Sequence, residues 1–172
     1  MPAHLNNPSR PGREAGPRGG AAFTLVELLI VITIIGILAT IVIPQFSNAS
    51  VQAKENALKD ELRYLRTQIV VYKAQHRDTA PGIGSSNFVD QMTKYTNEAG
   101  ATSTTASTTH KFGPYLPKMP KNPMNGLDAI EVTTQNPLTA DGGQGWKYNP
   151  VTMEIIADVQ GNDSVGTPFA DY

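Results

Sequence analysis

One carboxylate lies inside the most apolar segment of the chain. Residues 23–43 read FTLVELLIVITIIGILATIVI, and Glu27 is their only charged residue. At about 1.5 Å per residue, a helix of this length is roughly 31 Å long and matches the roughly 30 Å hydrocarbon core of a bilayer. The segment is therefore predicted to cross a membrane. An ionisable group inside such a segment is costly, so it indicates a function and a charged partner.

The residues before this segment offer a cation for Glu27. Residues 1–22 are rich in Gly, Pro and Arg, and small residues fill positions 19–22. A cut between Ala22 and Phe23 would leave the apolar segment on the mature chain, which is not the order of a secretory signal peptide. The new ammonium of Phe23 would lie one helical turn from Glu27, on the same face. A cut after Gly20 is the alternative, and it would displace Glu27 from the fifth position of the mature chain.

This arrangement resembles the type IV pilin and type II secretion pseudopilin superfamily, whose precursors carry a basic leader, a small residue and a Phe-Thr-Leu-Val-Glu-Leu start to a long apolar helix. Here that start is residues 23–28, and Gly36 and Pro44 also match family positions. The resemblance implies that a prepilin peptidase cuts before Phe23 and methylates its amine. It also implies that Glu27 meets the Phe23 ammonium of a neighbouring subunit when subunits stack.

Ala22 departs from the superfamily, which usually has Gly before the cut. The alternative is an ordinary signal anchor that happens to contain a glutamate. In both cases the excess of positive charge before the apolar segment predicts a cytoplasmic amino-terminus and an exported remainder. This excess comes from Arg10, Arg13 and Arg18 against Glu14. The resemblance places such a chain in the bacterial inner membrane as a single-pass protein, in contact with lipid before assembly and with its carboxy-terminal domain in the periplasm.

The segment after Pro44 is predicted to continue as an amphipathic helix. Proline lacks an N–H and crowds a preceding carbonyl, so Pro44 predicts a kink or weak point, and Gly36 a second one. The resemblance implies that the segment between them can unwind in filaments. Apolar residues at intervals of three and four then predict a buried stripe that packs on the protein's own sheet rather than in a coiled coil: Leu58, Leu62, Leu65, Ile69 and Tyr72. The charged residues of this helix are expected on its solvated face: Lys54, Glu55, Lys59, Asp60, Glu61, Arg63 and Arg66.

The remaining residues are expected to form one small domain. The Pro and Gly residues at 78–84 are expected to end the helix. A short packed helix that ends near Gly100 is predicted next, from the spacing of Phe88, Met92 and Tyr95. Residues 101–109 predict a solvated loop, and the prolines of 113–123 an extended connection. Strands are expected at 127–134 and in a hairpin of 145–148 and 153–159.

The hairpin has a predicted register. Trp146 and Tyr148 should share one face, opposite Ile155 and Ala157. Many pseudopilin-like proteins have a similar hairpin with Gly where this chain has Met153, so a positive φ there would strain the backbone. The fold class is thus α+β, a long amino-terminal helix packed on a small antiparallel β-sheet. Its expected parts are a leader at 1–22, a membrane and assembly helix at 23–43, an amphipathic helix at 44–78 and a periplasmic domain at 79–172.

Catalytic chemistry is not evident in the sequence. There is no Cys, and the three His are scattered over leader, helix and loop, so the chain is interpreted as a non-enzyme. Calcium is the one cofactor to consider, because acidic residues gather after position 128. Asp158, Asn162 and Asp163 are its candidate ligands, and a solvated acidic tail is the alternative.

A nucleic-acid partner finds little support. The net charge is −1, and one group of lysines in the Pro-rich segment is the only candidate basic patch: Lys111, Lys118 and Lys121.

The resemblance therefore predicts a structural subunit of a type II secretion pseudopilus that drives protein export. Its partners would be copies of itself, other pseudopilins, prepilin peptidase and an inner-membrane assembly platform. The lack of Cys and the Gly-Pro-Tyr-Leu start at residues 113–116 favour the major pseudopilin. The alternative is a type IV pilin of a surface fibre that serves adhesion, motility or DNA uptake.

Overall fold

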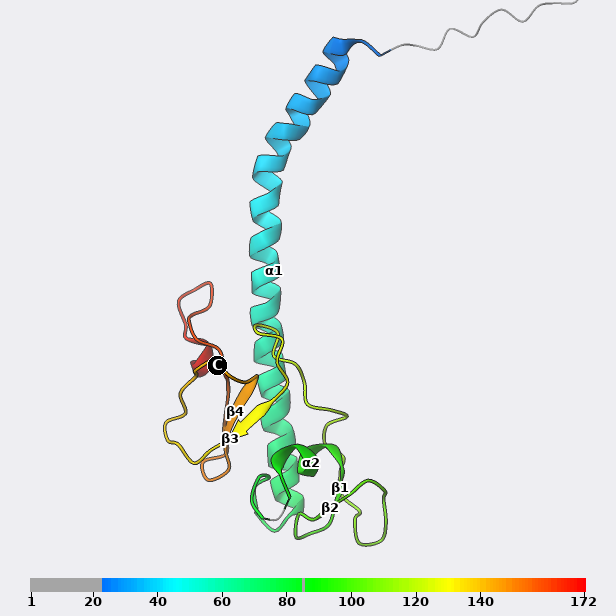
Figure 1. Cartoon of the computed structure of the whole chain (residues 1–172), viewed down its shortest axis with the longest axis vertical. Helices are drawn as coiled ribbons and strands as arrows, with labels where there is room; N and C mark the ends of the chain where they lie inside the picture. Colours follow the sequence, from blue (N-terminus) through cyan, green and yellow to red (C-terminus); the bar gives the residue numbers. More distant parts are fainter. Residues whose placement is uncertain (1–22, 85) are drawn as a thin grey trace, which may run out of the picture. The chain divides into compact units, whose positions relative to one another are not determined.

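The computed structural model describes residues 23–84 and 86–172. The expected leader, including Ala22, lies outside the described residues. The elements in chain order are α1 (Leu25–Gln75), α2 (Phe88–Thr93), β1 (Tyr95–Thr96), β2 (Thr102–Ser103), β3 (Ile130–Val132), β4 (Trp146–Asn149), β5 (Glu154–Ala157) and the 3-10 helix η1 (Phe169–Asp171) (Figure 1). The chain divides into two compact units between Ile43 and Pro44, inside α1.

The first unit contains the apolar part of α1. Its large apolar side chains are between 44 and 80% exposed within the single chain. By length and composition, α1 is the one described helix that could cross a membrane. The hydroxyls of Thr33 and Thr40 donate to the carbonyls of Leu29 and Ile37, both at 2.7 Å. These bonds satisfy the hydroxyls inside the helix itself, as an apolar surrounding requires.

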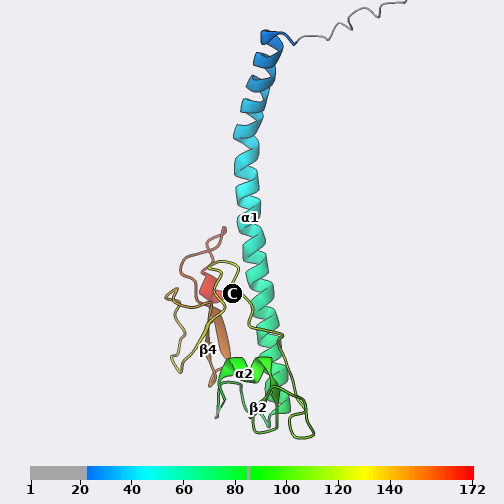
Figure 2. The ribbon, with the colours of Figure 1, turned by 45° about the vertical axis from the view of Figure 1, so that its right-hand side comes forward.

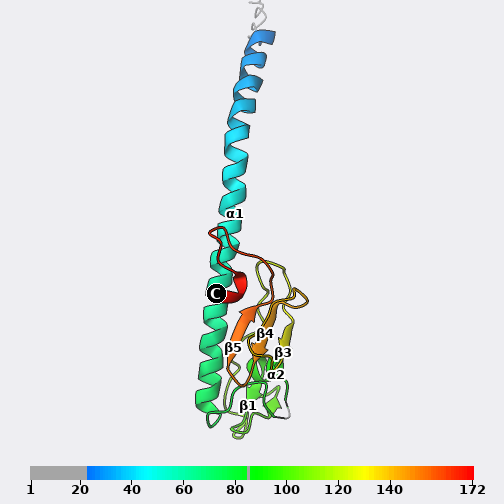
Figure 3. The same cartoon turned by 90° about the vertical axis from the view of Figure 1, so that its left-hand side faces the viewer.

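The second unit is built on the predicted stripe of α1. Each of its five residues is at most 1% exposed: Leu58, Leu62, Leu65, Ile69 and Tyr72. They form one core with the inner residues of the β4–β5 hairpin. Figures 2 and 3 show β4 and the carboxy-terminus beside this part of α1. The stripe and its packing on the protein's own sheet are confirmed.

The helix ends earlier than the expected residue 78. After Gln75 the chain turns through Arg77 and Asp78, whose φ values of 51° and 66° are left-handed. The Asp78 N–H donates to the carbonyl of Lys73 at 3.2 Å, which satisfies a carbonyl that the helix end leaves free.

The main sheet has three strands in the order β3-β4-β5. β4 and β5 are antiparallel, and Trp146 pairs with Ala157 and Tyr148 with Ile155, as predicted. β3 instead runs parallel to β4, so the α+β class is confirmed but the sheet is mixed rather than antiparallel. The connection from 133 to 145 is long enough for the crossover that a parallel pair needs.

The turn of the β4–β5 hairpin and the short helix α2 were both predicted from the sequence. Met153 has a φ of 60°, so the expected strain at the hairpin turn is present. The short helix α2 forms and buries Phe88 and Met92, but it ends at Thr93. Tyr95 belongs to β1, which pairs antiparallel with β2 in the Thr-rich segment, where β-branched residues favour a strand. The expected helix to Gly100 is therefore wrong.

Candidate assembly site

Glu27 caps the start of α1 together with Thr24. The Thr24 N–H and hydroxyl both donate to Glu27 Oε2 at 2.8 Å, and the Glu27 N–H donates to the Thr24 hydroxyl at 3.2 Å. This reciprocal pair is a capping box, which satisfies backbone donors that a helix start leaves free. The Thr-x-x-Glu spacing is the signature of this motif, so the sequence could have identified Thr24 as a partner of Glu27.

The capping box leaves half of the carboxylate available. Among the described residues, no hydrogen bond reaches Glu27 Oε1. Phe23 and Glu27 are both exposed in the single chain, at the end of the apolar segment. Within the part of the chain that the structure describes, Oε1 of Glu27 is thus available to a further donor.

Gly36 and Pro44 lie in the middle of the same helix. A Cβ on Gly36 would meet nothing within 4 Å, so packing inside the chain does not require glycine there. The bounds of α1 include Pro44 without interruption. The proposed unwinding and the kink at Pro44 stay predictions.

Asp158, the first calcium candidate, is fully buried and accepts three backbone N–H groups. Its Oδ1 accepts from the N–H groups of Asp141 and Gly142 at 2.7 and 2.9 Å. Its Oδ2 accepts from the Gln144 N–H at 2.8 Å. These donors occupy lone pairs that a bound cation would need. The carboxylate thus anchors the loop of residues 141–144.

Asp163, the second candidate, is likewise occupied. It accepts from the Tyr172 hydroxyl at 2.6 Å and from the N–H groups of Val165 and Thr167 at 2.9 and 2.8 Å. The Tyr172 hydroxyl, followed by these N–H groups and the Lys59 ammonium at 3.8 Å, holds the pKa of Asp163 below its usual value. Asn162 is exposed and forms a bridge with Pro168.

The described residues contain no group of three or more His, Asp or Glu placed to hold a metal ion. The carboxylates of Asp158 and Asp163 are engaged with donors of the protein itself, so their geometry gives the calcium hypothesis no support. It remains a prediction.

Glu55 corrects the expectation of a solvated charged face. It is 5% exposed, and its two oxygens accept from the Ser164 N–H and hydroxyl, both at 2.8 Å. One turn later, the Lys59 ammonium lies 4.1 Å from the centre of the Tyr172 ring. These side chains of α1 fasten the carboxy-terminal segment, and the helical pattern alone could not show that this segment returns to them.

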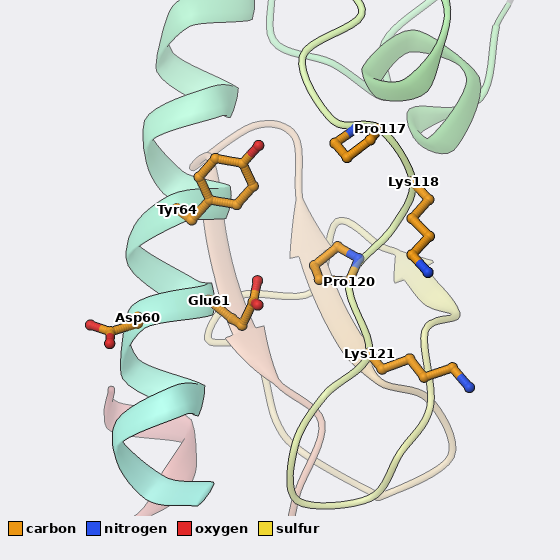
Figure 4. Close-up of a pocket in the computed structure, with 7 residues that line it drawn as sticks. All are labelled: Asp60, Glu61, Tyr64, Pro117, Lys118, Pro120 and Lys121. Carbon is orange, nitrogen blue, oxygen red and sulfur yellow. The ribbon is translucent and has the colours of Figure 1, made fainter. Parts of the chain in front are cut away.

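The candidate nucleic-acid lysines do not form a continuous basic patch. Lys118 and Lys121 line a hollow of about 560 Å³ that also includes Asp60 and Glu61. In Figure 4, Glu61 points into the space between α1 and the Pro-rich segment, and both lysines point away from the helix. Lys111 lies 3.9 Å from the Glu98 carboxylate. Acidic groups thus lie close to these lysines.

His76 is a buried group whose environment the sequence did not reveal. Its ring stacks on Tyr72 with a centroid distance of 3.7 Å. Nδ1 lies 2.7 Å from the Tyr72 carbonyl, and Nε2 lies 2.9 Å from the Thr96 hydroxyl. Burial lowers the pKa of His76, although the backbone contacts oppose the shift. The ring joins the end of α1 to β1.

Comparison with known proteins bears on the amino-terminal site. Residues 18–43 match the family described as the prokaryotic N-terminal methylation motif. In this segment the chain is similar to the type IV pilin and pseudopilin superfamily. The match contains the apolar half of α1, the capping box and the junction between Ala22 and Phe23.

Curated relatives come from both branches of this superfamily. The chain is 36% identical over 56 residues to the type II secretion system core protein G of Pseudomonas aeruginosa, covering 33% of this chain and 39% of that protein. It is 34% identical over 94 residues to a type IV major fimbrial protein FimA of Dichelobacter nodosus, covering 52% of this chain and 60% of that protein. It is 49% identical over 45 residues to the type IV major pilin protein PilA of Myxococcus xanthus, covering 26% and 20%. The matches thus span less than two thirds of these relatives, and no solved structure matches the chain.

Proposed function

We propose that the chain is a structural subunit of a pilin-like filament, made as a precursor. The leader is removed between Ala22 and Phe23, the new amine is methylated, and mature subunits polymerise through the apolar half of α1. The observation that carries the proposal is the exposed apolar helix whose first turn presents the Glu27 carboxylate.

The lipid environment determines which interactions can hold the helices of neighbouring subunits together. In lipid, apolar helices gain little from meeting each other, because acyl chains are as apolar as their side chains. A carboxylate and an ammonium do gain, since the low dielectric strengthens their attraction. The ammonium of Phe23 on one subunit and Glu27 on its neighbour therefore set the register in which the helices stack.

The pseudopilus of a type II secretion system is the favoured filament. The similarity to core protein G and the absence of Cys support it. So does the Gly-Pro-Tyr-Leu segment, in which Gly113 has a φ of 71° and a Cβ would lie 2.9 Å from the Lys94 carbonyl oxygen. In this setting the subunit waits in the inner membrane, with its second unit in the periplasm. Prepilin peptidase and an inner-membrane assembly platform act on it.

A surface pilin is the second candidate, because fimbrial and pilin proteins are also similar to the chain. Deleting the gene separates the two. A pseudopilin mutant should retain secreted proteins in the periplasm and keep its surface fibres. Loss of surface fibres with normal secretion would favour the pilin.

Substitution of Glu27 by Ala tests the proposal directly. The monomer should insert in the membrane at least as well, because a costly intramembrane charge is removed. Filaments should be lost, because removing one partner of a buried ion pair leaves the other charge uncompensated, at a cost of about 3–5 kcal/mol.

The measurement compares subunit extracted from membranes with subunit in sheared filaments. Glu98→Ala, which removes an exposed carboxylate of the second unit, is the control and should assemble normally. Wild-type filament yield from Glu27→Ala would show that this carboxylate does not drive docking.

A further inference from the structure

Strand β3 leaves one edge of the main sheet open. It pairs with β4 on one side only, in the order β3-β4-β5, and Figure 3 shows it on the side of the sheet away from α1. The other outer strand, β5, contacts η1 and lies beside α1. An open edge exposes backbone donors and acceptors that can pair with another chain. Residues 127–134, which contain β3 and its flanks, are the β3 edge.

The backbone of the β3 edge points alternately toward β4 and away from it. The Thr133 N–H and the Ala129 carbonyl both bond to β4, at 2.9 and 3.1 Å. Residues two apart on a strand face the same neighbour, so the peptide groups of Ile130 and Val132 face away from β4. Within the described part of the chain, no hydrogen bond outside the ladder with β4 reaches these groups. Both residues therefore present an N–H and a carbonyl to a further strand.

Glu131 lies at the centre of the β3 edge, and the chain compensates its charge only in part. Its carboxylate lies 3.2 Å from the Lys147 ammonium, but Asp141 lies nearer to the same ammonium, at 2.7 Å. The Glu131 side chain is 45% exposed, so a partner can reach it. Opposite charges at facing positions of paired strands stabilise a sheet, and like charges destabilise it. Glu131 therefore favours a basic residue at the facing position.

The same carboxylate disfavours a second copy of this chain at the β3 edge. If two such edges pair antiparallel about Glu131, their carboxylates face each other directly. Short, charged edge strands are a common means by which sheets avoid pairing with identical copies. Apolar side chains lie on either side of the charge, since Leu127 and Val132 are 41 and 40% exposed. The edge is thus suited to a different chain, in which a basic residue lies between apolar ones.

We propose that the β3 edge binds an extended segment of another protein as a fourth strand of the main sheet, with a Lys or Arg of that segment facing Glu131. The outward N–H groups and carbonyls of Ile130 and Val132 supply the main-chain hydrogen bonds, and Glu131 supplies the selectivity. The inference goes beyond the proposed filament, because it assigns a partner surface to the second unit that does not depend on how copies stack.

Synthetic peptides test the proposal on the full-length chain in detergent. The probe is a fluorescein-labelled peptide, Thr-Val-Thr-Lys-Thr-Val-Thr, whose binding is followed by fluorescence anisotropy. A second peptide has Glu in place of Lys, and a third keeps Lys but is N-methylated on alternate residues. The Lys peptide should bind about three- to tenfold more tightly than the Glu peptide. The N-methylated peptide should not bind, because it cannot donate main-chain hydrogen bonds at the blocked positions.

Two substitutions at Val132 separate main-chain pairing from side-chain contact. Val132→Pro removes the outward N–H and leaves the ladder with β4, because this peptide group faces away from β4. Val132→Ala keeps the N–H and is the matched control. Val132→Pro should weaken binding of the Lys peptide about tenfold or more, whereas Val132→Ala should change it less than about threefold. The fluorescence of Trp146, the only tryptophan, checks that each variant is folded.

Glu131→Gln tests the selectivity and should make the Lys and Glu peptides bind alike. If Val132→Pro does not fold, this variant and the N-methylated peptide still decide the question. Three results would overturn the inference: no binding of the Lys peptide, binding of the N-methylated peptide, or equal binding of the Lys and Glu peptides by the wild type. Peptide binding that appears only when dimers of the chain dissociate would assign the edge to a second copy and overturn it too. None of these measurements requires filaments, so the proposed function is tested separately.

Discussion

Replacing Asp158 by Asn should detach the loop at residues 141–144 from the second unit. The wild-type carboxylate is fully buried and accepts three backbone N–H groups at 2.7 to 2.9 Å. The side-chain carbonyl of an asparagine can still accept the two hydrogen bonds that the N–H groups of Asp141 and Gly142 donate. Its amide N–H₂ would then face the N–H of Gln144, and two donors cannot bond each other.

The expected destabilisation follows from this geometry. A hydrogen bond to a charged group contributes about 1.5–3 kcal/mol, and the two remaining bonds weaken when their acceptor becomes neutral. We therefore expect the free energy of unfolding to fall by about 2–4 kcal/mol. For a unit of this size the midpoint of thermal unfolding should drop by roughly 8–16 °C. The exposed control Asp128→Asn should change the free energy by no more than about 0.5 kcal/mol.

Trp146 makes the measurement direct. It is the only tryptophan, it is fully buried, and it lies next to the loop, so its fluorescence reports unfolding of the mature chain in detergent. The same experiment tests the calcium hypothesis, because a calcium ligand at Asp158 would make the wild-type midpoint rise with added calcium. The backbone donors predict a midpoint that calcium and chelator leave unchanged. An Asp158→Asn variant as stable as the wild type would refute the reasoning.

Three further predictions concern the core. Because burial lowers the pKa of His76, the unfolded chain binds more protons than the folded one below about pH 6.5, and the free energy of unfolding should fall as the pH drops through this range. Denaturant titrations at several pH values should show that this free energy depends less on pH in a His76→Phe variant. Leu62→Ala should cost about 2–5 kcal/mol in unfolding experiments, whereas Val70→Ala, on the exposed side of α1, should cost far less. The Tyr148 hydroxyl is buried without a partner among the described residues, so Tyr148→Phe should leave the unfolding midpoint unchanged or raise it; a clear loss of stability would point to a missed partner.

The sequence predicted the features that depend on local periodicity. The spacing of Leu58, Leu62 and Leu65 identified the buried side of α1, because one helical face is fixed by intervals of three and four residues. Alternation of side chains likewise gave the register of Trp146 and Tyr148 against β5. Hairpins that have glycine at the position of Met153 had raised a positive φ there as a condition for strain, and the structure has that φ.

Features that depend on distant parts of the chain were missed. Glu55 looked solvated because its partner, Ser164, is remote in sequence. The parallel pairing of β3 depends on a connection without regular structure, and His76 is buried by aromatic residues from a later loop. Glu27 was recognised from its apolar surroundings, but its bond with Thr24 is a local motif that could have been predicted.

The mature amino-terminus of subunits taken from filaments tests the central claim most directly. Mass spectrometry and amino-terminal sequencing should find a chain that begins at methylated Phe23, with residues 1–22 absent, and this product should disappear in cells without prepilin peptidase. A subunit that retains the leader, or one that begins beyond Ile43, would contradict the account, because in neither case could an ammonium at Phe23 meet Glu27 of its neighbour.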